Sequence, residues 1–336
     1  MIDYRSEAPE ILRDFLSYHE TIKAHSQRTV DEYFLDLRNF FRYLKLTRDP
    51  ELSSCALADV DIMDVDLAFV RSVTLTDVYG YMSYLSRERA RHQNSRNTGY
   101  GLSATSRARK ISTIRSFYGY LTNKVHLIEQ NPVKEMDTPK LRKPLPKYLT
   151  LDESMRLLDT VNGANRVRDY AILTLFLNCG LRISELCGLD LHDIQGEALR
   201  VLGKGGKERI VYLNAACMDA LNDWLAARRP ITGRDRDALF LSSRNERISK
   251  STVHVLVKKH LAAAGLDATQ YSSHKLRHTA ATLMLQNGVD VRAVQEVLGH
   301  EHLNTTEIYT HIDNDSLRVA ARANPLSKVK PPKRNN

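Results

Sequence analysis

The sequence predicts a mainly α-helical protein with one small β-sheet, divided into two domains. The chain of 336 residues is longer than a single small domain and suits two. Apolar residues recur at helical spacing along most of it, whereas the alternation typical of strands is confined to two short stretches. Between residues 131 and 150 prolines and lysines interrupt this pattern, and such a segment cannot be a continuous helix.

The first domain, expected over residues 1–135, is predicted to consist of helices. Apolar faces indicate two helices within residues 10–46, separated by a polar break at residues 25–27, and a third at residues 74–86. A fourth helix opens at Ser103 or Thr105, after a basic stretch that is expected to be a loop. A linker is expected at residues 136–149.

The second domain, expected over residues 150–324, combines helices with a β-hairpin. Residues 198–202 and 208–213 alternate like strands, and the glycines between them permit the positive φ angles that a tight turn requires. Before the hairpin, helices are predicted to open at Asp152, to span residues 167–178 up to Gly180, and to span residues 183–189. After it, helices are predicted at about 216–228, 250–264, 275–286, 290–298, 303–310 and 315–323. A basic tail, residues 325–336, is expected to be disordered by itself.

The charge of the chain favours a polyanionic partner. Lysine and arginine total 49 against 40 acidic residues, a formal net charge of +9. The four cysteines show no CxxC spacing and are expected to be free thiols in a reducing compartment. The charged N-terminus is unlike a signal peptide, and no apolar run approaches the ~18 residues of a membrane span. A cytoplasmic protein without a membrane partner is expected.

One ordered set of side chains carries most of the chemical information. It contains two arginines, a lysine, two histidines and a final tyrosine, namely Arg182, Lys204, His274, Arg277, His300 and Tyr309. Such a set can neutralise a phosphodiester and attack it with a phenol. Taken singly, each residue has an ordinary alternative; Arg182, for example, is expected to form an ion pair with Glu185, which is compatible with holding the guanidinium ready for a phosphate.

Metal and nucleotide chemistry are disfavoured. His274 and His278 have the i, i+4 spacing of a zinc pair, but Lys275 stands where the HExxH motif needs glutamate. The glycine–lysine run of the hairpin is not a phosphate-binding P-loop, since Glu208 follows Lys207 where serine or threonine is required. The carboxylates of Asp61, Asp64 and Asp66 are interpreted as a solvated loop. No metal site is expected.

The strings GLRISEL, GKGGKERIVYLN, HKLRHTAATLMLQNGVDVRAVQEVLGH and TTEIYTHI resemble the tyrosine recombinase (phage integrase) family, and within it the bacterial Xer branch. This resemblance runs from about Leu149 almost to the end. The first domain is similar to the family more weakly, through SQRTVDEYFLDLRNFFRYL and SATSRARKISTIRSFYGYL. The resemblance implies a helical SAM-like core-binding domain followed by an α+β catalytic domain.

The resemblance also implies a site-specific recombinase that works without metal, ATP or another cofactor. Tyr309 would attack a DNA strand and form a 3′-phosphotyrosyl link. Arg182, Arg277 and His300 would stabilise the charge of the transition state. His274 would assist proton transfer from the tyrosine, and Lys204 would protonate the departing 5′-oxygen. The expected cellular role is resolution of chromosome dimers, and hence chromosome partition at cell division.

The implied partners are DNA and further recombinase subunits. The expected assembly is a homo- or hetero-tetramer on two double-stranded recombination sites, held together through the C-terminal helix at residues 314–323. An accessory activating protein is a further expected partner. The candidate DNA contacts are basic residues of the first domain, Arg28, Arg107, Arg109 and Lys110. Base readout, phosphate contact and a solvated face stay open for each of them.

Three other functions stay in view. An integrase or transposase of a mobile element would use the same catalytic domain, and a type IB topoisomerase shares the chemistry. Two short helices around Gly288 could also mimic the helix-turn-helix of a non-catalytic DNA-binding protein. The complete residue set disfavours the last alternative, because a protein that only binds DNA has no use for Tyr309.

Overall fold

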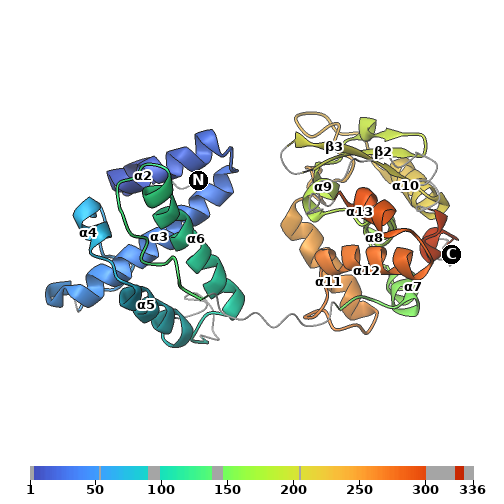
Figure 1. Cartoon of the computed structure of the whole chain (residues 1–336). Coiled ribbons are helices and arrows are strands. Elements are labelled where there is room, and N and C mark those ends of the chain that lie inside the picture. The colour runs from blue at the N-terminus through green and yellow to red at the C-terminus, as the bar shows by residue number, and fades with distance from the viewer. Residues whose placement is uncertain are drawn as a thin grey trace. The chain divides into compact units, whose positions relative to one another are not determined.

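The fold is mainly α-helical with one small antiparallel sheet, as the sequence predicts (Figure 1). The computed structural model describes residues 4–52, 54–89, 99–137, 147–203, 206–299 and 322–328. Two compact units form, residues 1–143 and 144–336, and each has its own hydrophobic core. The segment predicted as a linker spans the division between them.

The N-terminal unit is built from helices. They are α1 (Tyr4–Glu7), α2 (Glu10–Ser17), α3 (Gln27–Arg48), α4 (Leu67–Arg71), α5 (Leu75–Arg87) and α6 (Ala104–Asn123), with a π-helical turn at Tyr18–Ile22 and a 3-10 turn at Pro50–Leu52. Local signals set the starts of these helices: Thr74 and Asp77 form a capping box on α5, and the Ser103 hydroxyl caps α6 as expected. The short α4 was not predicted, because five residues carry too little periodicity.

A buried carboxylate fastens α3 to α6. Asp36 of α3 is 1% exposed and accepts hydrogen bonds from three residues of α6. The guanidinium of Arg109 donates to both oxygens, at 2.7 and 3.0 Å. Lys110 Nζ donates to Oδ1 at 2.6 Å, and the Thr113 hydroxyl donates to Oδ2 at 3.0 Å. All four donors come from one stretch of α6, so they fix the rotation of that helix about its axis.

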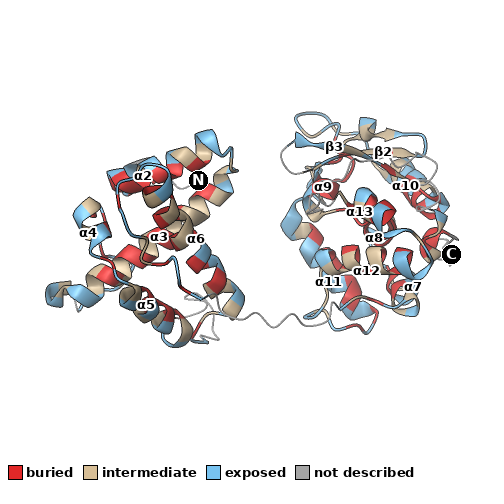
Figure 2. Ribbon diagram, viewed as in Figure 1, coloured by how far each residue is buried: buried red, intermediate tan, exposed pale blue. Residues whose placement is uncertain are grey.

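The C-terminal unit surrounds a single central helix. Its helices are α7 (Leu151–Asp159), α8 (Arg166–Cys179), α9 (Ile183–Gly188), α10 (Ala215–Ala227), α11 (Lys250–Ala263), α12 (Ser273–Gln286) and α13 (Val291–Leu298), with a 3-10 turn at Leu191–Asp193. Every residue of α8 from Arg168 to Cys179 is buried (Figure 2). A helix that is buried on all sides needs neighbours on all sides. It ends at Gly180, which takes the left-handed conformation (φ 58°), as the sequence predicts.

The sheet has the strand order β1 (Ile194–Gln195), β2 (Ala198–Leu202) and β3 (Glu208–Tyr212), all antiparallel. The predicted hairpin is β2–β3, and Val201 pairs with Arg209 in its register. The side chains that alternate toward the core include Val201 and Val211, while Leu202 and Ile210 stay exposed. Strand β1 was not predicted, because two residues cannot show alternation.

The chain end differs from the prediction. Residues Pro325–Lys328 form a 3-10 turn instead of the start of a disordered tail, and Leu326 is fully buried in the core. The side-chain amide of Asn324 donates to the carbonyl oxygen of Leu177, near the end of α8, at 2.9 Å. The burial of Leu326 and the hydrogen bond of Asn324 therefore hold this segment in place despite the basic composition of the chain end. The helix predicted at residues 303–310 lies outside the described residues, as does nearly all of the one at 315–323. Across the described ranges, no helix combines the length and apolarity needed to cross a membrane.

Candidate active site

A buried carboxylate surrounded by arginines lies where α9 begins. Glu185 is in the first turn of α9, and its side chain is 2% exposed. Arg182 binds it twice: the backbone N–H donates to Oε2 and Nη1 donates to Oε1, both at 2.7 Å. Arg209 of β3 donates from Nη1 to Oε1 and from Nη2 to Oε2, both at 2.9 Å. Four hydrogen bonds fill the acceptor positions of the carboxylate and fix its orientation. The predicted ion pair of Arg182 with Glu185 is confirmed.

Three arginines also bind the C-terminal end of α13, where helix carbonyls lack partners within the helix. Their acceptors are the carbonyl oxygens of three successive residues: Arg209 Nε donates to Val297 at 3.0 Å, Arg277 Nη2 to Leu298 at 2.5 Å, and Arg182 Nη2 to Gly299 at 2.9 Å. Positive charges are thereby placed at the negative end of the helix dipole. Gly299 is the residue directly before His300.

Arg277 is the most buried of these arginines, at 4% exposed. Its Nη1 donates to the carbonyl oxygen of Gly180 at 2.6 Å, so the guanidinium bridges the ends of α8 and α13. Burial, followed by the positive charge of Arg182, lowers the pKa of Arg277 to about 10, although Glu185 opposes the shift. The guanidinium therefore remains charged at neutral pH, and three such groups face one carboxylate.

His274 lies in the first turn of α12, one turn before Arg277. Partial burial lowers the pKa of His274, and the charges of Arg277, Lys275 and Arg182 add to this effect. The ring packs edge-on against that of His278, with 4.8 Å between centroids. His274 is consequently a neutral imidazole beside arginines, which suits a proton acceptor next to a bound anion.

The structure brings together three of the six residues that the sequence selects. Arg182, His274 and Arg277 converge from α9 and α12, near the end of α13. The other three, Lys204, His300 and Tyr309, lie outside the described residues. The residues just before Lys204 and His300 are described. Gly203, before the lysine, donates its N–H to the carbonyl oxygen of Lys207 at 2.7 Å, and the carbonyl oxygen of Gly299, before the histidine, accepts from Arg182.

The sequence profile of the phage integrase family matches residues 147–315. A protein from Caldanaerobacter subterraneus subsp. tengcongensis, named tyrosine recombinase XerC, is 48% identical over 321 residues, which cover 95% of this chain and 88% of that protein. This chain belongs to the phage integrase family. It is a tyrosine recombinase, an enzyme of DNA strand exchange, as the sequence predicts.

Solved structures agree on the fold of this tyrosine recombinase. The XerH site-specific recombinase bound to difH substrate in a pre-cleavage complex has a TM-score of 0.60 at 22% identity, over 92% of this chain and 84% of that one. A lambda integrase tetramer bound to a Holliday junction has a TM-score of 0.58 at 19% identity, over 89% and 80%. At this level of identity the likeness establishes the recombinase fold.

Sequence reasoning missed Arg209. The residue lies within the string GKGGKERIVYLN, yet no role follows from the string alone. The alternation of side chains along the strand could have revealed it. Ile210 points outward, so its neighbours Arg209 and Val211 share the inward side of β3. An arginine on the inward side needs a buried acceptor, and Glu185 supplies it.

The candidate DNA contacts of the recombinase differ in their surroundings. Lys110 is buried and paired with Asp36, so its ammonium is not available to DNA, and its assignment as a DNA contact is corrected. Arg109 shares Asp36 and is 47% exposed. Arg107 donates to the Ser86 hydroxyl at 2.9 Å, and Arg28 is exposed. The last three keep their place as proposed contacts.

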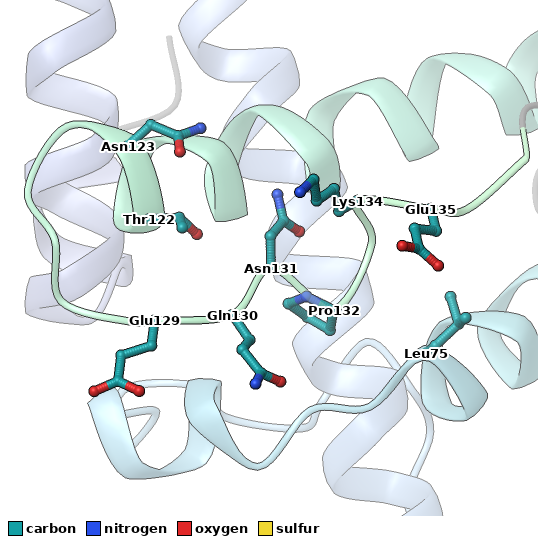
Figure 3. Close-up of a pocket in the computed structure, with 9 residues that line it drawn as sticks. All are labelled: Leu75, Thr122, Asn123, Glu129, Gln130, Asn131, Pro132, Lys134 and Glu135. Carbon is teal, nitrogen blue, oxygen red and sulfur yellow. The ribbon is translucent and has the colours of Figure 1, made fainter.

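Two other features of the recombinase do not form a reactive site. Within the described residues, Asp190, His192 and Asp193 have metal-ligand spacing, but Arg247 binds Asp190 and Arg200 binds Asp193. A cavity of about 430 Å³ in the N-terminal unit is lined by the end of α6, the following loop at residues 129–135 and Leu75 (Figure 3). Its two glutamates and one lysine do not converge on a common point in Figure 3.

The acidic loop near Asp64 has a basic neighbour that the sequence did not reveal, Lys45.

The lowered pKa of His274 predicts a defined response of DNA cleavage to pH. A group with a lowered pKa stays neutral until the pH falls below its ordinary value of about 6.5. If His274 accepts the tyrosine proton, the single-turnover cleavage rate should fall only below about pH 6.5. His274→Gln should slow cleavage and remove this acid limb, whereas His278→Gln should retain the limb. An acid limb with its midpoint above pH 6.5, or one that persists in His274→Gln, would assign it to another group.

Proposed function

We propose that this tyrosine recombinase resolves chromosome dimers, by cutting and rejoining double-stranded DNA at a recombination site through a 3′-phosphotyrosyl link at Tyr309. The observation that carries the proposal is that Arg277 and Arg182 bind the carbonyl oxygens of Leu298 and Gly299, the two residues before His300. Guanidinium groups there supply forked donors for the non-bridging oxygens of a phosphodiester.

The proposed chemistry balances without a metal ion or ATP. The phenolic oxygen of Tyr309 attacks phosphorus, and its proton passes to the neutral imidazole of His274. The bond from phosphorus to the 5′-oxygen breaks, and Lys204 protonates that oxygen. Arg182, Arg277 and His300 stabilise the extra negative charge on the pentacoordinate phosphorus. Rejoining reverses these steps with the 5′-hydroxyl of a partner strand, since the energy of the broken bond is retained in the phosphotyrosine.

The proposed assembly is a tetramer on two DNA sites, formed by one recombinase or by two different ones. Its support is the fold shared with a lambda integrase that was solved as a tetramer on a Holliday junction. Arg28, Arg107 and Arg109 are proposed to contact the duplex, the helix at residues 314–323 to join neighbouring subunits, and an accessory protein to activate them. Cytoplasmic DNA is the proposed substrate, and the four cysteines, all free thiols, agree with a reducing compartment.

A trapping experiment tests this function. Duplexes selected from a random pool for binding to the full chain are nicked near their centre, so that the cleaved strand end diffuses away and the link persists. In EDTA, we expect an SDS-resistant protein–DNA adduct on a 3′-phosphate, and peptide mass spectrometry should place the nucleotide on Tyr309. Tight binding with no adduct, or a link to another residue, would refute the proposed mechanism.

A further inference from the structure

We propose that Arg209 is a positioning residue of the recombinase, which holds Arg182 and the end of α13 in place for the scissile phosphate. The proposal rests on the proposed function, because it assigns Arg182 to the phosphate. Arg209 acts through Glu185 and through backbone atoms of α13, and it is given no contact with DNA.

The contacts of Arg209 join three separate elements. Its two terminal nitrogens grip both oxygens of Glu185 in α9, and Nε donates to the carbonyl of Val297 in α13, while its own backbone belongs to β3. The side chain is 14% exposed. A planar fork with three hydrogen bonds to two fixed partners has one orientation, so β3, α9 and α13 are held in a single arrangement.

Arg209 also controls how much positive charge Arg182 can offer. Burial alone would raise the pKa of Glu185, but the hydrogen bonds and charge of Arg209, followed by those of Arg182, lower it. Glu185 is therefore ionised; its hydrogen bonds are shared between the guanidinium groups of Arg182 and Arg209, and that of Arg277 lies 3.9 Å away. Without Arg209, Glu185 would be balanced chiefly by Arg182, which would then attract a phosphate less strongly.

The side chain of Arg209 packs closely against Gly299, the residue before His300. A Cβ atom placed on Gly299 would lie 3.1 Å from Cδ of Arg209 and 3.2 Å from its Nε and Nη1. A side chain at this position would push the guanidinium away by a few tenths of an ångström, and φ of Gly299, at +64°, also favours glycine. Arg209 thus packs against the residue that precedes His300 and donates a hydrogen bond to Val297, two residues before that glycine.

The test compares two variants of the full chain with a matched control. Arg209→Lys keeps the charge but loses the fork, and Arg209→Met loses both. Arg200→Met is the control, because Arg200 lies in the same sheet, pairs with Asp193 and lies on the side of β2 opposite to Val201, the partner of Arg209. Single-turnover cleavage is measured on the nicked duplex at saturating DNA, together with the dissociation constant and the melting temperature.

We expect cleavage to slow about 10-fold in Arg209→Lys and about 100-fold in Arg209→Met, the usual range for residues that orient reactive groups. The dissociation constant for DNA should stay within about 3-fold, since Arg209 does not contact DNA, and Arg200→Met should match the wild type. Added guanidinium should restore part of the lost cleavage rate in Arg209→Met and leave the rate of the control unchanged. A rescue of this kind would not follow from a general loss of stability.

A substrate with sulphur in place of the bridging 5′-oxygen separates Arg209 from the hairpin lysine. A thiolate leaves without a proton donor, so this substrate should restore cleavage in Lys204→Ala but leave Arg209→Met slow. Restoration in Arg209→Met would mean that Arg209 acts through the hairpin and would overturn the proposal. Cleavage by Arg209→Met at the wild-type rate would also overturn the proposal for Arg209. The proposed function would still stand in that case, because the wild type would still form its adduct. If the wild type forms no adduct, the proposed function itself fails.

Discussion

Replacing Arg277 by alanine is expected to slow DNA cleavage by at least about 10²–10³-fold, the loss seen when one oxyanion donor is removed. Arg277 is 4% exposed and stays charged, because its pKa falls only to about 10. Its guanidinium also bridges Gly180 and Leu298, so alanine would remove the side-chain donor of two buried carbonyl groups. Unsatisfied groups of this kind cost about 1–3 kcal/mol each, so some loss of stability should accompany the loss of cleavage.

Single-turnover cleavage of the nicked duplex checks this expectation, with Tyr309→Phe as the background of the assay. Arg292→Ala is a suitable control, since Arg292 is an exposed arginine of α13. DNA binding by Arg277→Ala should stay within a few-fold of the wild type, because phosphate contacts at many positions share the binding free energy. A loss of binding that parallels the loss of cleavage would count against a catalytic assignment of Arg277.

Replacing Asp36 by alanine is expected to lower the free energy of unfolding of the N-terminal unit by about 3–5 kcal/mol, as when one partner of a buried ion pair is removed. The loss should be large because the buried side chain of Lys110 would lose the carboxylate that binds its ammonium group. Thr113 would lose its acceptor as well. Arg109 contributes less, since it is 47% exposed and also contacts Glu32.

Two probes of urea unfolding separate the units. The one tryptophan of the chain, Trp224, lies in α10 of the C-terminal unit, whereas circular dichroism reports helices of both. Asp36→Ala should shift a transition seen by circular dichroism and leave the Trp224 fluorescence transition unchanged. Glu32→Ala, at an exposed ion pair, should cost under about 1 kcal/mol. Asp36→Ala combined with Lys110→Met should recover part of the loss; no recovery would show that the buried lysine is not the cause.

Features with local causes were predictable from the sequence. The end of α8 at Gly180 and the β2–β3 hairpin follow from glycines at positions that need positive φ or tight turns, and both are confirmed. The ion pair of Arg182 with Glu185 is also local, because the two residues are three positions apart in the sequence.

Features that depend on distant partners were not predictable. Lys110 looks like a solvated basic residue until Asp36, on another helix, is placed beside it. The role of Arg209 depends on Glu185 and Val297, which are far from it in the sequence and approach it only when the helices pack. The burial of Leu326 likewise depends on a core that its own basic segment does not reveal. Composition and periodicity describe a residue's neighbours in sequence, and these three cases depend on neighbours in space.

The two attachments near the end of α8 limit how far the nucleophile can travel. On one side, Arg277 ties Leu298 to Gly180, and on the other, Asn324 binds Leu177. Tyr309 is ten residues beyond Gly299, and a chain spans at most roughly 3.3–3.6 Å per residue, so its reach is about 35 Å. Any strand that Tyr309 cleaves while both attachments hold must pass within that radius, whether the strand is bound by its own subunit or by a neighbour.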